Sequence, residues 1–279
     1  MAFQKSDYIA SYLKKNDIER YFSTLILPKK HQKAAQALFA FNAEVSSISL
    51  KVKEPASGEI RLAWWREILE GKREKEAIQN PIASVFLEVF KDYNLPTEPI
   101  IKLLEARQFD LYNDKMPNVE LFETYAGETN SILYQYVAMI LNDGNQIKNG
   151  DAAGYIGVAH ALIGHVNALG YNAARSRLFL PIDVFKAHGI SGQQIFEGKK
   201  SKQLDAAIAD FCEMAQDHLK KSRAAIKLLP KNTHVAFAYF FVLEKQLNLL
   251  KKQKSFALKS TKSLSNFKIL LSLVFRSQL

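Results

Sequence analysis

Asp110 and Asp114, in the segment ARQFDLYNDKMP, form a pair of acids whose spacing could hold a metal ion. Residues four apart on a helix lie on one face, so the two carboxylates would converge. Proteins commonly hold Mg²⁺ with one or two carboxylates together with phosphate oxygens of a substrate. The alternative, which we favour, is a helix end in which Arg107 pairs with Asp110 and Pro117 closes the segment.

The segment VNALGYNAARSRLFLP, residues 166–181, has the layout of a metal site but lacks the acids. Ala168 and Asn172 stand one helical turn apart, and carboxylates at these two positions would hold a divalent cation bound to a diphosphate. Arg175 and Arg177 follow directly. They are candidates for phosphate contacts, and a charged helix end is the structural alternative.

The block RLAWWRE, residues 61–67, combines aromatic and basic side chains. Neighbouring residues on a helix point in different directions, so Trp64 and Trp65 cannot both face the core. Arg61 precedes Trp65 by four residues and could stack on it as a cation–π pair. Anchoring of the block in the core is the alternative that we favour.

The histidines and the cysteine do not predict a metal site. His160 and His165 are five residues apart, which does not place them on one face as i, i+4 ligands would be, and no Cys or acid stands beside them. Cys212, the one cysteine, is predicted to be a buried free thiol.

Helical periodicity runs along almost the whole chain and predicts one all-α domain over residues 1–279. Twelve glycines and eight prolines are few for a strand-and-turn protein. Five glycines fall between 150 and 170, where they indicate close helix packing. A loop is predicted at 142–151, and helices are predicted at 7–16, 31–52, 59–71, 82–93, 97–114, 119–142, 152–175, 181–188, 201–228, 233–252 and 263–276.

The composition bounds the function classes. With 279 residues, 48% of them apolar, the chain can bury a core. A net charge of +10 suits nucleic acid, anionic lipid or a phosphorylated ligand, but no nucleic-acid-binding motif is present. No signal peptide or transit peptide is recognisable, and no stretch reaches the ~18 apolar residues of a membrane span. These patterns predict a cytoplasmic protein, either soluble or peripheral on a membrane.

The C-terminal segment SLSNFKILLSLVFRSQL, residues 263–279, predicts an amphipathic helix, and lysines gather upstream of it between 245 and 262. Such a helix either lies at the surface of an anionic inner membrane or packs on the protein's own core, and the pattern leaves both open. Its apolar face would consist of Leu264, Phe267, Leu270, Leu271, Leu273 and Val274.

Motifs along nearly the whole chain resemble the squalene/phytoene synthase family. They are LILP at 25–28, FAFNAEVSSISL at 39–50, the tryptophan block, and GVAHALIGHVNALGYNAARSRLFLP at 157–181. The resemblance implies an all-α isoprenoid synthase fold, in which two Asp-rich helices face each other across an apolar cavity and bind Mg²⁺ and two prenyl diphosphates. We therefore expect residues 34–50 and 154–173 to face one another.

The chain departs from the family pattern at every metal position. Ser46, Ser47 and Leu50 stand where the first motif has aspartates, and the aspartates of the second motif fall on Ala168 and Asn172. The Ser-Phe of the first family segment is replaced by Glu19-Arg20, and a glycine-containing segment is replaced by TNSILY at 129–134. YAGETNSILY instead resembles the respiratory complex I assembly-factor branch of the family, which the resemblance implies is not enzymatic. FNAE and GEIRLAWWRE resemble bacterial members of unassigned activity.

Two functions follow from these departures. Metal ions stabilise the diphosphate that leaves a prenyl chain, and Ser, Leu, Ala and Asn cannot hold them. We therefore favour a non-catalytic scaffold without a cofactor, which binds a lipid-like ligand or an unidentified protein and assists a respiratory membrane complex. The alternative is an active Mg²⁺-dependent head-to-head prenyltransferase that makes a squalene- or phytoene-like product, with Glu44, Asp110 and Asp114 as metal ligands. Candidate ligand or phosphate contacts are Arg61, Trp65, Arg107, Arg175 and Arg177.

Overall fold

The computed structural model describes residues 2–147, 151–253 and 263–274, and helices make up the secondary structure of this part of the chain. The predicted all-α fold is confirmed. The α-helices are α1 (Ala2–Asn16), α2 (Ile18–Leu25), α3 (Lys29–Ser46), α4 (Ile48–Lys51), α5 (Pro55–Leu69), α6 (Glu74–Gln79), α7 (Pro81–Asp92), α8 (Glu98–Ala106), α9 (Val119–Ala126), α10 (Ile132–Leu141), α11 (Asp151–Asn167), α12 (Leu169–Ala173), α13 (Ile182–Ala187), α14 (Gly192–Phe196), α15 (Lys202–Ile226), α16 (Phe240–Gln253) and α17 (Asn266–Val274).

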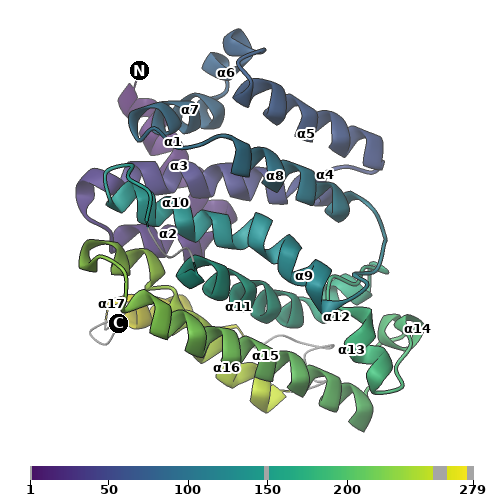
Figure 1. The fold of residues 1–279 in the computed structure, drawn as a ribbon. Helices are drawn as coiled ribbons and strands as arrows, with labels where there is room; N and C mark the ends of the chain where they lie inside the picture. The colour runs from purple at the N-terminus through teal and green to yellow at the C-terminus, as the bar shows by residue number, and fades with distance from the viewer. Residues whose placement is uncertain (1, 148–150, 254–262, 275–279) are drawn as a thin grey trace.

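In Figure 1 the helices lie in layers, with α5, α6 and α7 at the top, α3, α8 and α10 below them, and α11, α15 and α16 towards the bottom. The described residues also form helices of other types: the 3₁₀ helices η1 (Arg107–Leu111) and η3 (Lys231–Phe237), and the π-helix η2 (Gly127–Ser131). Among the described helices, α11 and α15 make the most extensive contact with each other.

Two buried hydrophobic clusters divide the described core. One is built mainly from α1, α3, α5, α7 and α8, and the other from α9, α11, α15, α16 and α17. Helix α10 contributes to both: Tyr134 and Ala138 belong to the second cluster, whereas Leu133, Tyr136 and Val137 belong to the first. The two halves of the protein therefore meet along α10.

Four helices predicted as continuous are broken. The helix predicted at 233–252 is 3₁₀ in its first part, η3, and α-helical only from Phe240 in α16. The helix predicted at 31–52 ends at Ser46, because the Ser47 hydroxyl donates to the carbonyl of Glu44 (2.7 Å), a local bond that competes with the helix. The helix predicted at 152–175 is interrupted at Ala168, between α11 and α12. The helix predicted at 97–114 changes to 3₁₀ geometry at Arg107 and ends at Leu111.

Helix α2 was not predicted, although its start carries a clear signal. Asp17 caps it by accepting a hydrogen bond from the backbone N–H of Arg20 (3.0 Å). Aspartate is among the favoured residues at this position because its carboxylate satisfies a free helix N–H. The cap separates α1 from α2 and turns Arg20 towards the core, where it is 8% exposed.

The close helix packing predicted from the glycines occurs at Gly157. A Cβ atom at this position would lie 2.1 Å from Oγ of Ser131 and 2.5 Å from its Cα, so α11 touches the backbone of the π-helix η2. The Ser131 hydroxyl also donates to the carbonyl of Gly154 (3.1 Å). At Gly154 and Gly164 a Cβ atom would meet nothing within 4 Å. Gly157 is therefore the glycine of α11 that this contact requires.

Candidate functional site

A cavity of ≈ 320 Å³, here called the central cavity, lies between the α3–α4 bend and helices α11 and α12. Segments 34–50 and 154–173 both line it, so they do face one another as expected. Many of the lining side chains are polar, and they stand beside the apolar groups of Leu50, Ala161, Ala168 and Phe179. The lining residues are Ser46, Ser49, Leu50, Arg107, Asp110, Tyr125, Asn130, His160, Ala161, Gly164, His165, Ala168, Tyr171, Asn172, Arg177 and Phe179.

A buried charged triad, Arg107, Asp110 and Tyr125, forms one wall of the cavity. Nη1 of Arg107 donates to Oδ2 of Asp110 and to the hydroxyl of Tyr125, both at 2.9 Å. The Tyr125 hydroxyl donates to Oδ1 of Asp110 at 2.6 Å. Burial is the largest cause that raises the pKa of Tyr125, so this hydroxyl keeps its proton and remains a donor. Both oxygens of the Asp110 carboxylate are therefore already bonded within the protein.

His160 and His165 lie on α11, and both line the cavity. The ring of His165 stacks on Phe179, with centroids 4.9 Å apart. Burial, assisted by the charge of Arg107, lowers the pKa of His165 to about 4, so this ring is neutral near pH 7. His160 lies 3.0 Å from the hydroxyl of Tyr134 and stacks on Tyr239, and burial also lowers its pKa. Neither histidine adds positive charge to the cavity.

The positions that carry aspartates in the family are mostly at the cavity. Ser46 and Leu50 line one wall, and Ala168 and Asn172 line the opposite wall. Ser47 is not among the lining residues, since its hydroxyl is turned to the carbonyl of Glu44. The frame of a two-sided metal site is therefore present in space, and neutral side chains occupy it.

The proposed substitute ligands Glu44, Asp110 and Asp114 do not come together. Glu44 points into a different pocket, where it accepts hydrogen bonds from Tyr12 and from Lys51 (2.9 Å). Asp114 follows the end of η1 in an exposed loop, so it shares no helical face with Asp110. The ion pair of Arg107 with Asp110, the alternative favoured from the sequence, is present.

The Mg²⁺ ions implied by the family do not fit these residues. Asp110 is the one carboxylate among the described residues that line the cavity, and Arg107 and Tyr125 hold both of its oxygens. Across the described ranges, no group of three or more His, Cys, Asp or Glu side chains is arranged to hold a metal ion. Mg²⁺ needs hard oxygen ligands that are free to coordinate, and this wall offers none.

The five candidate ligand contacts are spread over three places. Arg107 and Arg177 line the central cavity, and the guanidinium of Arg177 has no carboxylate partner among the described residues. Arg175 is exposed and stacks on Tyr171 at the rim, 3.6 Å from the ring centroid. Arg61 and Trp65 line a separate pocket with Glu44, where Trp65 is buried edge-on against Phe41. Trp65 is thus a core anchor, as favoured from the sequence.

Sequence reasoning missed several residues of the cavity, among them the polar side chains of Tyr125, Asn130, His160 and His165. Both histidines were dismissed because their spacing is wrong for shared metal ligation, but cavity lining does not need a shared helical face. Tyr125 and Asn130 belong to the segment YAGETNSILY. Its departure from the family pattern was the sequence feature that could have indicated a role at the cavity. Its π-helix places Asn130 at the cavity, where its Oδ1 accepts from Arg20 (3.3 Å).

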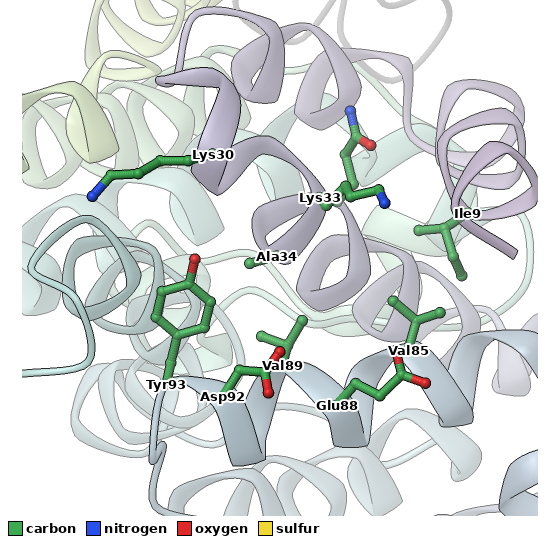
Figure 2. A pocket seen from close by; sticks show the side chains of 10 residues that line it. Ile9, Lys30, Lys33, Ala34, Val85, Glu88, Val89, Asp92 and Tyr93 are labelled. Atoms are coloured by element: carbon green, nitrogen blue, oxygen red, sulfur yellow. The ribbon is translucent and has the colours of Figure 1, made fainter. Parts of the chain in front are cut away.

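A second hollow, of ≈ 250 Å³, lies between α1, α3 and α7 and contains none of the predicted site residues. Figure 2 shows Lys30 and Lys33 on the α3 side and Glu88 and Asp92 on the α7 side. Lys30 pairs with Asp143 (3.0 Å). The hollow therefore has walls of opposite charge, and it is separate from the frame of the family site.

The sequence is similar to the squalene/phytoene synthases and to the assembly factors of respiratory complex I. The family model of squalene/phytoene synthase matches residues 13–267. The chain is 27% identical to "NADH dehydrogenase (ubiquinone) complex I, assembly factor 6" of Rattus norvegicus, covering 88% of this chain and 73% of that protein. It is 28% identical to the Homo sapiens protein of the same name, covering 90% of this chain and 75% of that protein.

Solved structures share the fold. A dehydrosqualene synthase in complex with ligand superposes with a TM-score of 0.81 at 18% identity, covering 97% of this chain and 95% of that chain. The squalene synthase HpnC from Alicyclobacillus acidocaldarius superposes with a TM-score of 0.77 at 16% identity, covering 90% and 94%. Because the family model spans most of its length, this chain belongs to the squalene/phytoene synthase family.

Proposed function

We propose that this protein is a non-catalytic member of its family that acts as an assembly factor for a respiratory NADH dehydrogenase complex. It uses the isoprenoid synthase scaffold to hold a partner or a lipid-like ligand, and it does not transfer prenyl groups. In this proposal the protein needs neither Mg²⁺ nor another cofactor.

One observation carries the proposal: the two walls of the central cavity face each other as in a prenyl synthase, but they present Ser46, Leu50, Ala168 and Asn172. Ionisation of a prenyl diphosphate requires stabilisation of a leaving group with several negative charges, which metal ions supply. Asp110 cannot take over this role while Arg107 and Tyr125 hold its oxygens. The similarity to the complex I assembly factors supports the same conclusion from sequence.

The first expected result concerns chemistry. Purified protein incubated with Mg²⁺ and farnesyl or geranylgeranyl diphosphate is expected to release diphosphate no faster than buffer, because no described cavity residue can template the metal. A dehydrosqualene synthase serves as the positive control in the same diphosphate assay. Turnover that requires Mg²⁺ and exceeds the buffer rate would refute the non-catalytic proposal.

The second expected result concerns assembly. Deletion of the gene in its source organism is expected to reduce the amount of assembled NADH dehydrogenase complex on native gels, and a plasmid copy should restore it. Isoprenoid lipids, extracted from the same cells, should be unchanged, since the protein makes none. Wild-type amounts of the complex in the deletion strain would contradict the assembly role, and a missing isoprenoid would point to the enzyme.

The described helices contain none that is both long and apolar enough to cross a membrane. An assembly factor of a membrane-bound complex works beside that membrane, so we place the protein on the cytoplasmic side, peripheral on the inner membrane.

A further inference from the structure

Helix α17 presents apolar side chains on two opposite faces. Ile269 and Leu273, together with the preceding Leu264, are buried in the C-terminal hydrophobic cluster. Phe267, Leu271 and Val274 are 71%, 40% and 62% exposed, respectively. The helix is thus held by the core through one face, while the other face remains open to solvent.

The three exposed side chains form a continuous strip, because positions i, i+4 and i+7 lie on one side of a helix. We call Phe267, Leu271 and Val274 the α17 strip. Helix α17 packs against α2 and α16, and in Figure 1 it lies at the edge of the molecule, near α2. The sequence left open whether this helix lies at a membrane or packs on the protein's own core. The two are compatible, because packing on the core leaves the α17 strip exposed.

Positive charge is concentrated in the same part of the sequence. Residues 245–279 contain seven lysines and one arginine and no Asp or Glu. The whole chain has 38 basic and 28 acidic residues, so residues 1–244 hold 30 basic and 28 acidic ones and are almost neutral. Lys245 and Lys252 on α16 and Lys268 on α17 are exposed. Nearly all of the net charge of +10 thus comes from the same C-terminal stretch of sequence as the α17 strip.

We propose that the α17 strip, together with the exposed lysines of α16 and α17 (Lys245, Lys252 and Lys268), docks the protein on an anionic lipid bilayer. The strip would enter the headgroup region, to a depth of roughly 5–10 Å, while the lysines contact lipid phosphates. The residue types favour lipid over an acidic protein, because protein interfaces are enriched in Arg and depleted in Lys, whereas this region has seven lysines to one arginine. This inference rests on the proposed peripheral location and identifies the surface that would contact the membrane. The exposure of the strip and the positive charge are observed whether or not the protein assists assembly.

The test is co-sedimentation of the full chain with two kinds of vesicle, phosphatidylcholine alone and phosphatidylcholine with phosphatidylserine. We expect binding to the anionic vesicles in low salt and its loss in high salt, because salt screens exposed charges. The triple variant Phe267→Gln/Leu271→Gln/Val274→Gln should bind at least about tenfold more weakly, since it removes the apolar burial. The variant Lys245→Gln/Lys252→Gln/Lys268→Gln should bind roughly a hundredfold more weakly.

Matched controls separate docking from general effects. Ile60→Gln removes an equally exposed apolar side chain (70%) elsewhere, and Lys14→Gln/Lys15→Gln/Lys91→Gln removes three exposed lysines elsewhere. These controls should bind like the wild type, and circular dichroism should show all variants folded. The inference is overturned if the wild type does not bind anionic vesicles in low salt, or if the controls lose as much binding as the test variants. It is also overturned if the variant of the α17 strip binds like the wild type, and the strip would then be assigned to a protein partner. None of these outcomes depends on the native-gel assay, so the assembly role and the docking surface can fail separately.

Discussion

Gly157→Ala is expected to lower the free energy of unfolding by about 3 kcal/mol or more. The added methyl group would lie 2.1 Å from Oγ and 2.5 Å from the backbone nitrogen of Ser131. Backbone atoms cannot move aside as the end of a flexible side chain can, so α11 and the π-helix η2 would have to separate. Urea denaturation followed by circular dichroism measures the change.

Gly154→Ala and Gly164→Ala are the matched controls, because both lie on α11 and a Cβ atom at either position meets nothing within 4 Å. Alanine is favoured over glycine inside a helix, so each control should gain up to about 1 kcal/mol. If Gly157→Ala is as stable as these two variants, the contact between α11 and η2 is not as close as described.

Asp110→Asn is expected to cost about 3–5 kcal/mol, because it leaves the guanidinium of Arg107 charged and without its carboxylate. The side chains of Arg107 and Asp110 are only 12% and 8% exposed, so water cannot replace the lost partner. Asn keeps one acceptor oxygen and places an NH₂ donor at the other position, so either Arg107 or Tyr125 faces a donor where it now donates to a carboxylate oxygen. The free energy of unfolding in urea is again the measurement.

Two further variants test the cause. Asp114→Asn, in the exposed loop, should change stability by less than about 0.5 kcal/mol. The double variant Arg107→Met/Asp110→Leu removes both charges and should recover much of the loss, since an apolar pair can replace a buried ion pair. Equal stabilities of Asp110→Asn and Asp114→Asn would show that the triad does not hold the wall of the central cavity together.

Much of the fold was predictable because amphipathic periodicity and helix-stop residues act locally. The predicted end of α5 at Gly71 is an example: the helix ends at Leu69, and Gly71 takes a positive φ of 75°, which glycine adopts without strain. The two walls of the cavity were also predictable, because residues 39–50 and 157–181 resemble the family motifs that line it.

The details of the site depend on contacts between distant segments, which periodicity does not report. The spacing of Asp110 and Asp114 predicts one helical face, but the chain changes to 3₁₀ geometry at Arg107 and ends this helix at Leu111. Asp110 is instead bound by Tyr125, fifteen residues further along the chain. The break at Ser47 falls where two adjacent serine hydroxyls, of Ser46 and Ser47, bond to helix carbonyls inside a segment that otherwise has helical spacing. The polar side chains of the cavity likewise come partly from α9, η2 and α11, which only the fold brings together.

The position of α10 between the two hydrophobic clusters has a consequence for how the protein unfolds. Loss of either cluster would expose one face of α10, with Tyr136 and Val137 on one side or Tyr134 and Ala138 on the other. Because the same backbone carries both faces, melting of one half removes packing partners from the other half. The helix therefore couples the two halves into one cooperative transition, and a partner bound to either half stabilises both.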